Sequence, residues 1–107
     1  MDPHRLAELR SIAYHQRVAE RLAAHPELRA AALRRLDDWT HSGSLHADYV
    51  TAWRRLLAMP DAELARALVV DDDEGRALRQ TTPFAGALAP RERWEIHRRV
   101  REELEAG

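Results

Sequence analysis

The sequence contains no cysteine, which excludes disulfide bonds, thiolate metal sites and a cysteine nucleophile. It also lacks a long apolar run, since no stretch approaches the ~20 residues that a membrane-spanning helix needs. The first residues, Met1 to Arg5, are charged and do not favour export. We therefore expect a protein of the reducing cytoplasm.

Lysine is absent as well, so all seventeen basic residues are arginines. Two explanations remain open: codon bias in a GC-rich genome, or selection for the planar, bidentate contacts of arginine at an interface. Charge is unevenly distributed, because residues 1–35 hold seven arginines against four acids and residues 61–74 hold six acids against Arg66 alone. A nucleic acid would favour one dominant basic face, so this asymmetry favours a protein partner.

Large side chains for a core are scarce, because only six residues are aromatic and much of the hydrophobic content is alanine. A chain of 107 residues buries roughly 65% of its unfolded surface and forms one domain. Apolar residues recur every three to four positions, which is typical of helices, and no strand-like alternation is convincing. The sequence predicts an all-α single domain over residues 1–107, an irregular bundle of five or six short helices.

Prolines, glycines and caps mark the expected helix ends. Asp2 and Pro3 predict the start of a first helix that runs to about residue 24, and Gly43 supplies a left-handed end to the second. The helix over residues 47–59 has the strongest amphipathic pattern and is expected to organise the core. Further helices are expected from residue 60, over residues 73–79 and from residue 90. The last has a narrow apolar seam, formed by Ile96, Val100 and Leu104 with Trp94 beside them.

No pattern predicts a catalytic or cofactor site. The serines and threonines lack a triad-like context, and the four glycines are scattered rather than gathered in a phosphate-binding loop. The acidic run Asp71–Glu74 lacks calcium-loop spacing, and its consecutive side chains point in different directions. We interpret this run as a helix cap and a solvated turn. We therefore predict neither an enzyme nor a bound cofactor.

Histidines are the remaining candidates for metal ligands. His41 and His46 flank a Ser-Gly-Ser turn with Asp48 nearby, a donor set that zinc accepts in principle, but the spacing matches no helix-borne ligand pair. We interpret these histidines as caps or surface residues. His15 and His97 lie beside apolar positions of their helices and are expected to be packed or half-buried. No metal site is predicted.

Two features bear on nucleic-acid binding. Residues 64–68 look like the first helix of a helix-turn-helix, but the recognition helix would then begin with Asp71–Glu74, which phosphates repel. The more plausible basic surface is the side of the first helix that carries Arg10, Arg17 and Arg21. These arginines are candidate partner-binding residues, and a solvated face is the alternative.

The segment from Thr81 to Pro90 has two interpretations. In the first, Phe84 plugs the bundle and the prolines set the path of the chain. In the second, Phe84 joins Arg93 and Trp94 in an interface anchor of the aromatic-plus-arginine type.

The last third of the chain carries a resemblance. Residues 78–94, LRQTTPFAGALAPRERW, resemble a signature of short helical bacterial proteins encoded beside a nucleotidyltransferase-like protein in toxin–antitoxin-type gene pairs. Residues 19–22 and 49–53 also resemble that group, so the similarity extends over nearly the whole chain. The resemblance implies an antitoxin-like protein that binds the partner enzyme and blocks its active site or its substrate entry.

We accordingly expect a non-enzymatic protein-binding module that neutralises a nucleotidyltransferase-type toxin from the adjacent gene. The alternative is a small nucleic-acid-binding transcriptional regulator that uses its first helix. The predicted partner-binding residues are Arg10, Arg17, Arg21, Phe84, Arg93 and Trp94.

Overall fold

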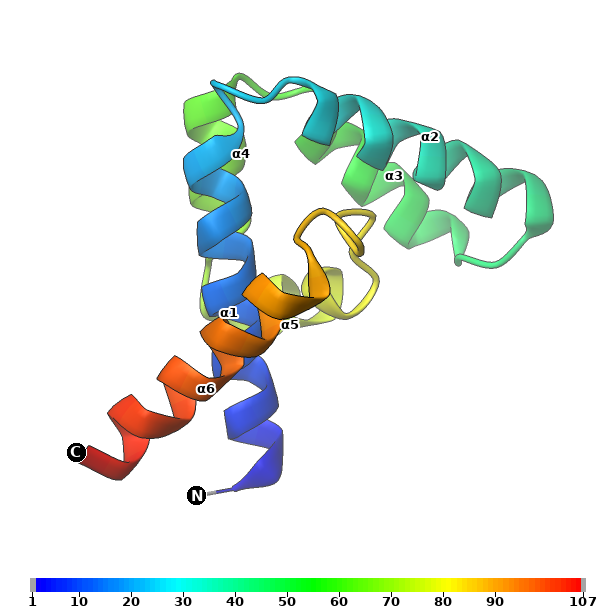
Figure 1. Ribbon diagram of the computed structural model, residues 1–107. Helices are drawn as coiled ribbons and strands as arrows, with labels where there is room; N and C mark the ends of the chain where they lie inside the picture. Colours follow the sequence, from blue (N-terminus) through cyan, green and yellow to red (C-terminus); the bar gives the residue numbers. More distant parts are fainter. Residues whose placement is uncertain (1, 107) are drawn as a thin grey trace.

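The computed structural model describes residues 2–106, which form six helices and no strand (Figure 1). This confirms the predicted all-α class. The helices are α1 (Pro3–Arg21), α2 (Glu27–Ser42), α3 (Ala47–Leu57), α4 (Asp61–Ala67), α5 (Asp73–Gln80) and α6 (Pro90–Ala106). Within residues 2–106, no helix is both long and apolar enough to cross a membrane.

The helix ends follow local sequence signals. Asp2, His46 and Asp72 each accept a hydrogen bond from a backbone N–H of the helix that follows, at 3.0, 3.1 and 2.7 Å. These caps satisfy donors that the first turn of a helix leaves free. Gly43 ends α2 with a φ of 71°, which confirms the predicted left-handed end.

Two helices are shorter than predicted. α1 ends at Arg21 and α3 ends at Leu57, three and two residues before their expected ends. In each case a proline follows, Pro26 or Pro60. A proline nitrogen cannot donate the hydrogen bond that would continue the helix through the preceding turn. The interruption therefore reaches back several residues from the proline itself.

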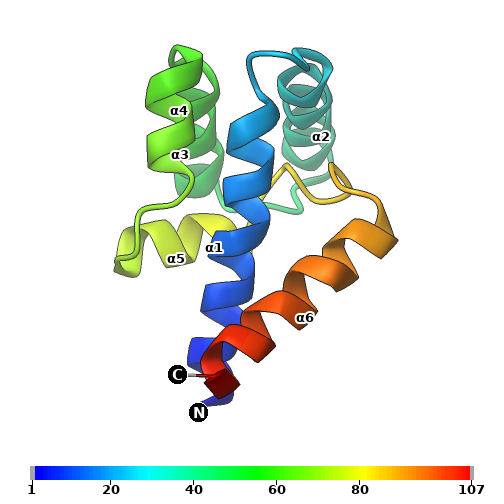
Figure 2. The same ribbon diagram turned by 60° about the vertical axis from the view of Figure 1, so that its left-hand side comes forward.

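The helices are arranged around α1. It packs against α4, α5 and α6, while α2 and α3 pack against each other as a pair (Figure 1). Figure 2 shows α6 running diagonally beside the first half of α1. The start of α1 and the end of α6 consequently lie at the same end of the molecule.

The core forms around α3, as its amphipathic pattern predicted. Trp53 is 1% exposed and meets the ring of Phe84 edge to face, with the two ring centroids 6.2 Å apart. α3 and four other helices, α1, α2, α4 and α6, contribute buried aliphatic or aromatic side chains to this cluster, and α5 adds the partly buried Leu78. The buried side chains include Val18, Leu36, Val50, Leu56, Leu57, Leu64, Leu68 and Ile96.

The connecting segment, residues 81–89 between α5 and α6, is tied to α1. The Tyr14 hydroxyl donates a hydrogen bond to the carbonyl of Phe84 at 2.7 Å and accepts one from the N–H of Leu88 at 3.4 Å. His15 Nε2 lies 2.8 Å from the hydroxyl of Thr82. Phe84 and Leu88 are 1% and 3% exposed. The interpretation of Phe84 as a plug in the bundle is therefore confirmed.

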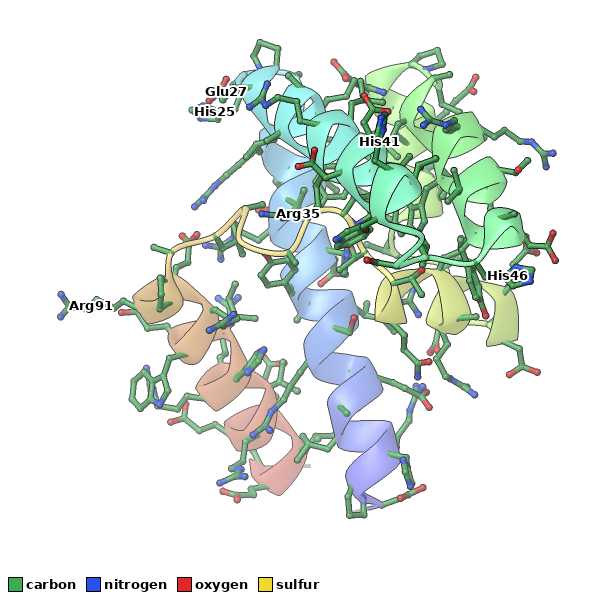
Figure 3. The ribbon with its side chains drawn as sticks, turned by 90° about the vertical axis from the view of Figure 1, so that its right-hand side faces the viewer. His25, Glu27, Arg35, His41, His46 and Arg91 are labelled. Carbon is green, nitrogen blue, oxygen red and sulfur yellow. The ribbon has the colours of Figure 1, made fainter. Side chains whose placement is uncertain are left out.

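The connecting segment is also tied to α2 and α3. Trp53 Nε1 donates to the hydroxyl of Thr81 at 3.1 Å, and Arg35 donates to the carbonyl of Pro83 at 3.2 Å. Figure 3 shows Arg35 reaching from α2 to this segment. The segment thus joins three helices that are distant in the sequence.

Trp94 does not lie beside the buried seam of α6, contrary to the prediction. It is 63% exposed, whereas Ile96 and Val100 are 2% and 9% exposed. Two residues correspond to a rotation of about 200° around a helix, so Trp94 and Ile96 face nearly opposite directions.

Replacing Phe84 with alanine should lower the free energy of unfolding by about 3–5 kcal/mol, because it removes the ring that packs on Trp53 and leaves a cavity. Urea denaturation followed by circular dichroism measures this change. Phe84→Leu, which keeps most of the buried volume, should cost clearly less. Equal stability of the alanine variant and the unmodified protein would contradict the plug.

Stability should also fall as the pH decreases from about 6.5 to about 4, because burial lowers the pKa of His15 from 6.5 to about 4. The unfolded chain binds a proton in this range and the folded chain does not, so the loss reaches at most about 3 kcal/mol. Urea unfolding over a pH series measures it. His15→Gln should flatten this slope, and His41→Gln, at an exposed position of α2, should leave it unchanged.

Candidate interaction surface

The crossing of α1 and α6 is held by an ion-pair cluster. Arg21 contacts Glu92 through both ends of its guanidinium, at 2.7 and 2.5 Å, and Arg17 contacts the same carboxylate at 3.3 Å. The hydrogen bond from Arg21 holds the pKa of Glu92 below its usual value. Glu92 also lies in the first turn of α6, where the helix dipole favours negative charge.

This cluster changes the predicted role of the first helix. Arg17 and Arg21 bind an acid of the same chain, so they hold α6 in place. Arg10 has no ion pair among the described residues and lies further along α1, towards its start. The three arginines therefore do not form one free basic face, and Arg10 alone remains open to a partner.

Arg10 instead meets residues of α6. A depression of about 380 Å³ is lined by Arg10 from α1 and by Arg93 and His97 from α6, with Gly86 of the connecting segment on its wall. Burial lowers the pKa of His97, and the positive charges of Arg10 and Arg93 lower it further. The structure therefore brings together two of the predicted partner-binding residues and His97, which was expected to be packed or half-buried and is half-buried.

A second depression, of about 340 Å³, shares Arg10 and His97 with the first and extends to the exposed Trp94. The guanidinium of Arg98 lies 5.5 Å from the centroid of the Trp94 ring, within cation–π range. No aspartate or glutamate lines either depression. We call this region the arginine–tryptophan surface, formed by Arg10, Arg93, Trp94, His97, Arg98 and Arg101.

Phe84 does not belong to this surface, which corrects its prediction as a partner-binding residue. Its ring is 1% exposed and packs against Trp53 in the core. An interface anchor must be accessible in the free protein or become so by rearrangement of the core. Of the predicted aromatic pair, Trp94 alone is presented to solvent.

The acidic and histidine candidates serve local structure. Asp72 caps α5, and Asp71 forms a two-pronged contact with Arg5 at 3.0 and 2.9 Å, so this run is a cap and a turn. In Figure 3, His41 and His46 lie well apart. Residues 2–106 contain no group of three histidine, aspartate or glutamate side chains suited to hold a metal ion.

Arg98 and Arg101 were not predicted as parts of the surface. Arg98 follows Trp94 by four residues, the spacing at which side chains touch on a helix. The contact between these two residues could therefore have been predicted from the sequence. The contact between Arg21 and Glu92 could not have been predicted in this way, because the two residues lie 71 positions apart in the sequence.

No protein-family model, curated protein or solved structure matches this chain.

A double-mutant cycle on Arg21→Gln and Glu92→Gln should give a coupling of about 0.5–1 kcal/mol, since the pair is bidentate but partly exposed to solvent. Because the folded pKa of Glu92 is lowered, this stabilisation is complete above the ordinary value of 4.5 and is lost as the pH falls through the folded value. Unfolding at pH 7 and at acid pH measures both effects. The looser pair Arg91–Glu95, at 3.9 Å, is the control and should show no measurable coupling.

Proposed function

We propose that this chain is a cytoplasmic, non-enzymatic protein-binding module that acts as the antitoxin-like partner of a nucleotidyltransferase-type toxin. The observation that carries the proposal is the arginine–tryptophan surface on α6 and the start of α1. The resemblance of residues 78–94 to proteins of toxin–antitoxin-type gene pairs supports the same role and supplies the identity of the partner.

The composition of the surface suits a protein interface. Tryptophan and arginine are the residue types that most often dominate binding energy, and they do so from the centre of a contact. Trp94 is 63% exposed, and it and Val70 are the large hydrophobic side chains left exposed within residues 2–106. Burying the Trp94 indole against a partner would remove a large apolar area from water. The neighbouring Arg98 is paired with Glu102 of the same helix at 2.7 Å.

The charge of the surface suits an acidic partner. Arg10, Arg93 and Arg101 form no ion pair within residues 2–106, so a partner's carboxylates would meet arginines without local competition. A nucleotidyltransferase holds metal-binding carboxylates in its active site, as the resemblance implies. A basic helix placed over those carboxylates would block metal or substrate entry without any chemistry of its own.

A nucleic-acid-binding regulator remains the second candidate, because the lining of both depressions contains arginine and no acid. Its predicted form, binding through the first helix, is weakened since Arg17 and Arg21 are engaged by Glu92. The exposed acids at the start of α5 would also repel a phosphate backbone.

Co-expression with the product of the adjacent gene should yield a stoichiometric complex that survives nuclease treatment, and it should relieve growth arrest caused by that product. Trp94→Ala should weaken the complex by about tenfold or more, because the indole is the proposed anchor. Calorimetric titration of the purified proteins measures the affinity.

Val70→Ala is the matched control, since Val70 is the other exposed large hydrophobic residue, at 43%, and should bind normally. Absence of any complex would overturn the proposal. A complex that requires nucleic acid and weakens steeply with salt would favour the second candidate instead.

A further inference from the structure

The charges around the two depressions are unbalanced in a way that points to an anionic ligand. Arg10 enters from α1 and Arg93 from α6, and both flank His97. No acid lines this region, and neither arginine has an ion pair within residues 2–106. Burial is the main cause of the lowered pKa of His97, and the positive charges of Arg10 and Arg93 lower it further.

Arg10 also carries an unsatisfied donor. Its Nε is buried and has no hydrogen-bond partner among residues 2–106. Buried N–H groups are nearly always paired, because an unpaired one loses its hydrogen bonds to water and gains none within the protein. Nε itself is out of reach of a ligand, but an anion bound to the part of this guanidinium that lines the depression would offset the cost of placing Arg10 there.

The volume of the region is larger than an inorganic ion needs. The first depression measures about 380 Å³ and has the Tyr14 ring and Ala85 on its wall. The second measures about 340 Å³, shares Arg10 and His97 with the first, and continues to Trp94. These volumes lie at the lower end of the range of small-molecule sites, from about 300 to 1,000 Å³, and both depressions are open to solvent. A matching ligand has an anionic end and a flat, largely apolar body.

We propose that the two depressions bind a nucleoside phosphate. Its phosphate accepts hydrogen bonds from the guanidinium groups of Arg10 and Arg93, whose planar forks match phosphate oxygens. Its base lies against the exposed indole of Trp94, where stacking is favourable for any base. His97 lies between the two subsites and donates to the phosphate or the sugar.

This proposal goes beyond the proposed function and does not depend on a protein partner. Its test uses the isolated full chain, so loss of the partner hypothesis would leave it standing. If both hold, the nucleotide and the partner compete for Trp94 and Arg93.

The experiment is calorimetric titration of the full chain with AMP, inorganic phosphate and adenosine at low salt. AMP should bind more tightly than phosphate, and adenosine more weakly than AMP. Arg10→Gln and Arg93→Gln should each lower the AMP affinity by about tenfold. Trp94→Ala should lower the affinity for AMP and leave that for phosphate unchanged. Amide chemical-shift changes on AMP addition should centre on residues 93–98.

Arg91→Gln is the matched control, because Arg91 is on the same helix but extends into solvent, with 92% of its side chain exposed (Figure 3). In a parallel titration at about 0.1 M salt, where the Debye length is about 10 Å, this variant should change the AMP affinity by less than about twofold. Thermal unfolding checks that every variant is folded, and Arg10 has no ion pair to lose.

Three results would overturn the proposal. The first is no binding of AMP at millimolar concentration, and the second is an equal loss of affinity in Arg91→Gln and Arg10→Gln, which indicates diffuse charge attraction. The third is binding of oligothymidylates whose affinity rises with each added nucleotide far above that of AMP, which indicates a nucleic-acid surface.

Discussion

The Tyr14 hydroxyl is buried between α1 and the connecting segment, where it donates to the carbonyl of Phe84 and accepts from the N–H of Leu88. A buried hydroxyl is stable only when it is paired, so these two hydrogen bonds fix the segment against α1. The Phe84 ring is then directed onto Trp53 of α3, and Pro90 starts α6 at a set position. This anchoring point therefore helps to set where α6 crosses α1, and the ion pairs of Arg17 and Arg21 with Glu92 hold the crossing.

The crossing divides the arginines of α1 into two groups. Glu92 is the third residue of α6 and meets Arg17 and Arg21, which lie near the end of α1. Further along α6 the residue that faces α1 is His97 rather than an acid, so Arg10 is left without a counter-ion. One glutamate at the start of α6 thus separates a structural interface from a basic surface that is available for binding.

Local signals predicted most of the fold. Asp2, Pro26 and Gly43 set helix ends through hydrogen-bonding capacity and backbone freedom, and these properties act within one turn of the chain. The burial of Phe84 was predicted as one of two alternatives, because a lone aromatic in a proline-bounded segment fits a core as well as an interface. The exposure of Trp94 could have been predicted from helix geometry alone, because Trp94 lies two residues before Ile96 and so faces away from it.

The candidate surface was predicted only in part, since it depends on contacts between residues far apart in the sequence. Nothing near Arg17 or Arg21 distinguishes them from Arg10, yet Glu92 binds the first two and not the third. Such selection follows from the angle at which α6 crosses α1. That angle depends on the connecting segment and its hydrogen bonds to three helices. The spacing of apolar residues in the sequence does not predict these hydrogen bonds.

All basic residues of this protein are arginines, and several of its internal contacts use the guanidinium group. Arg21 grips both oxygens of Glu92, and the buried Arg79 donates to two backbone carbonyls beyond the end of α4, at 3.3 and 2.7 Å. The bidentate contact with Glu92 needs the planar fork of a guanidinium, which an ammonium group does not have. Arginine is therefore the residue by which this protein satisfies acceptors at its internal junctions. Arg10 and Arg93 line the depression between α1 and α6 with the same type of guanidinium group and have no ion pair within residues 2–106, which is why we propose an anionic ligand there.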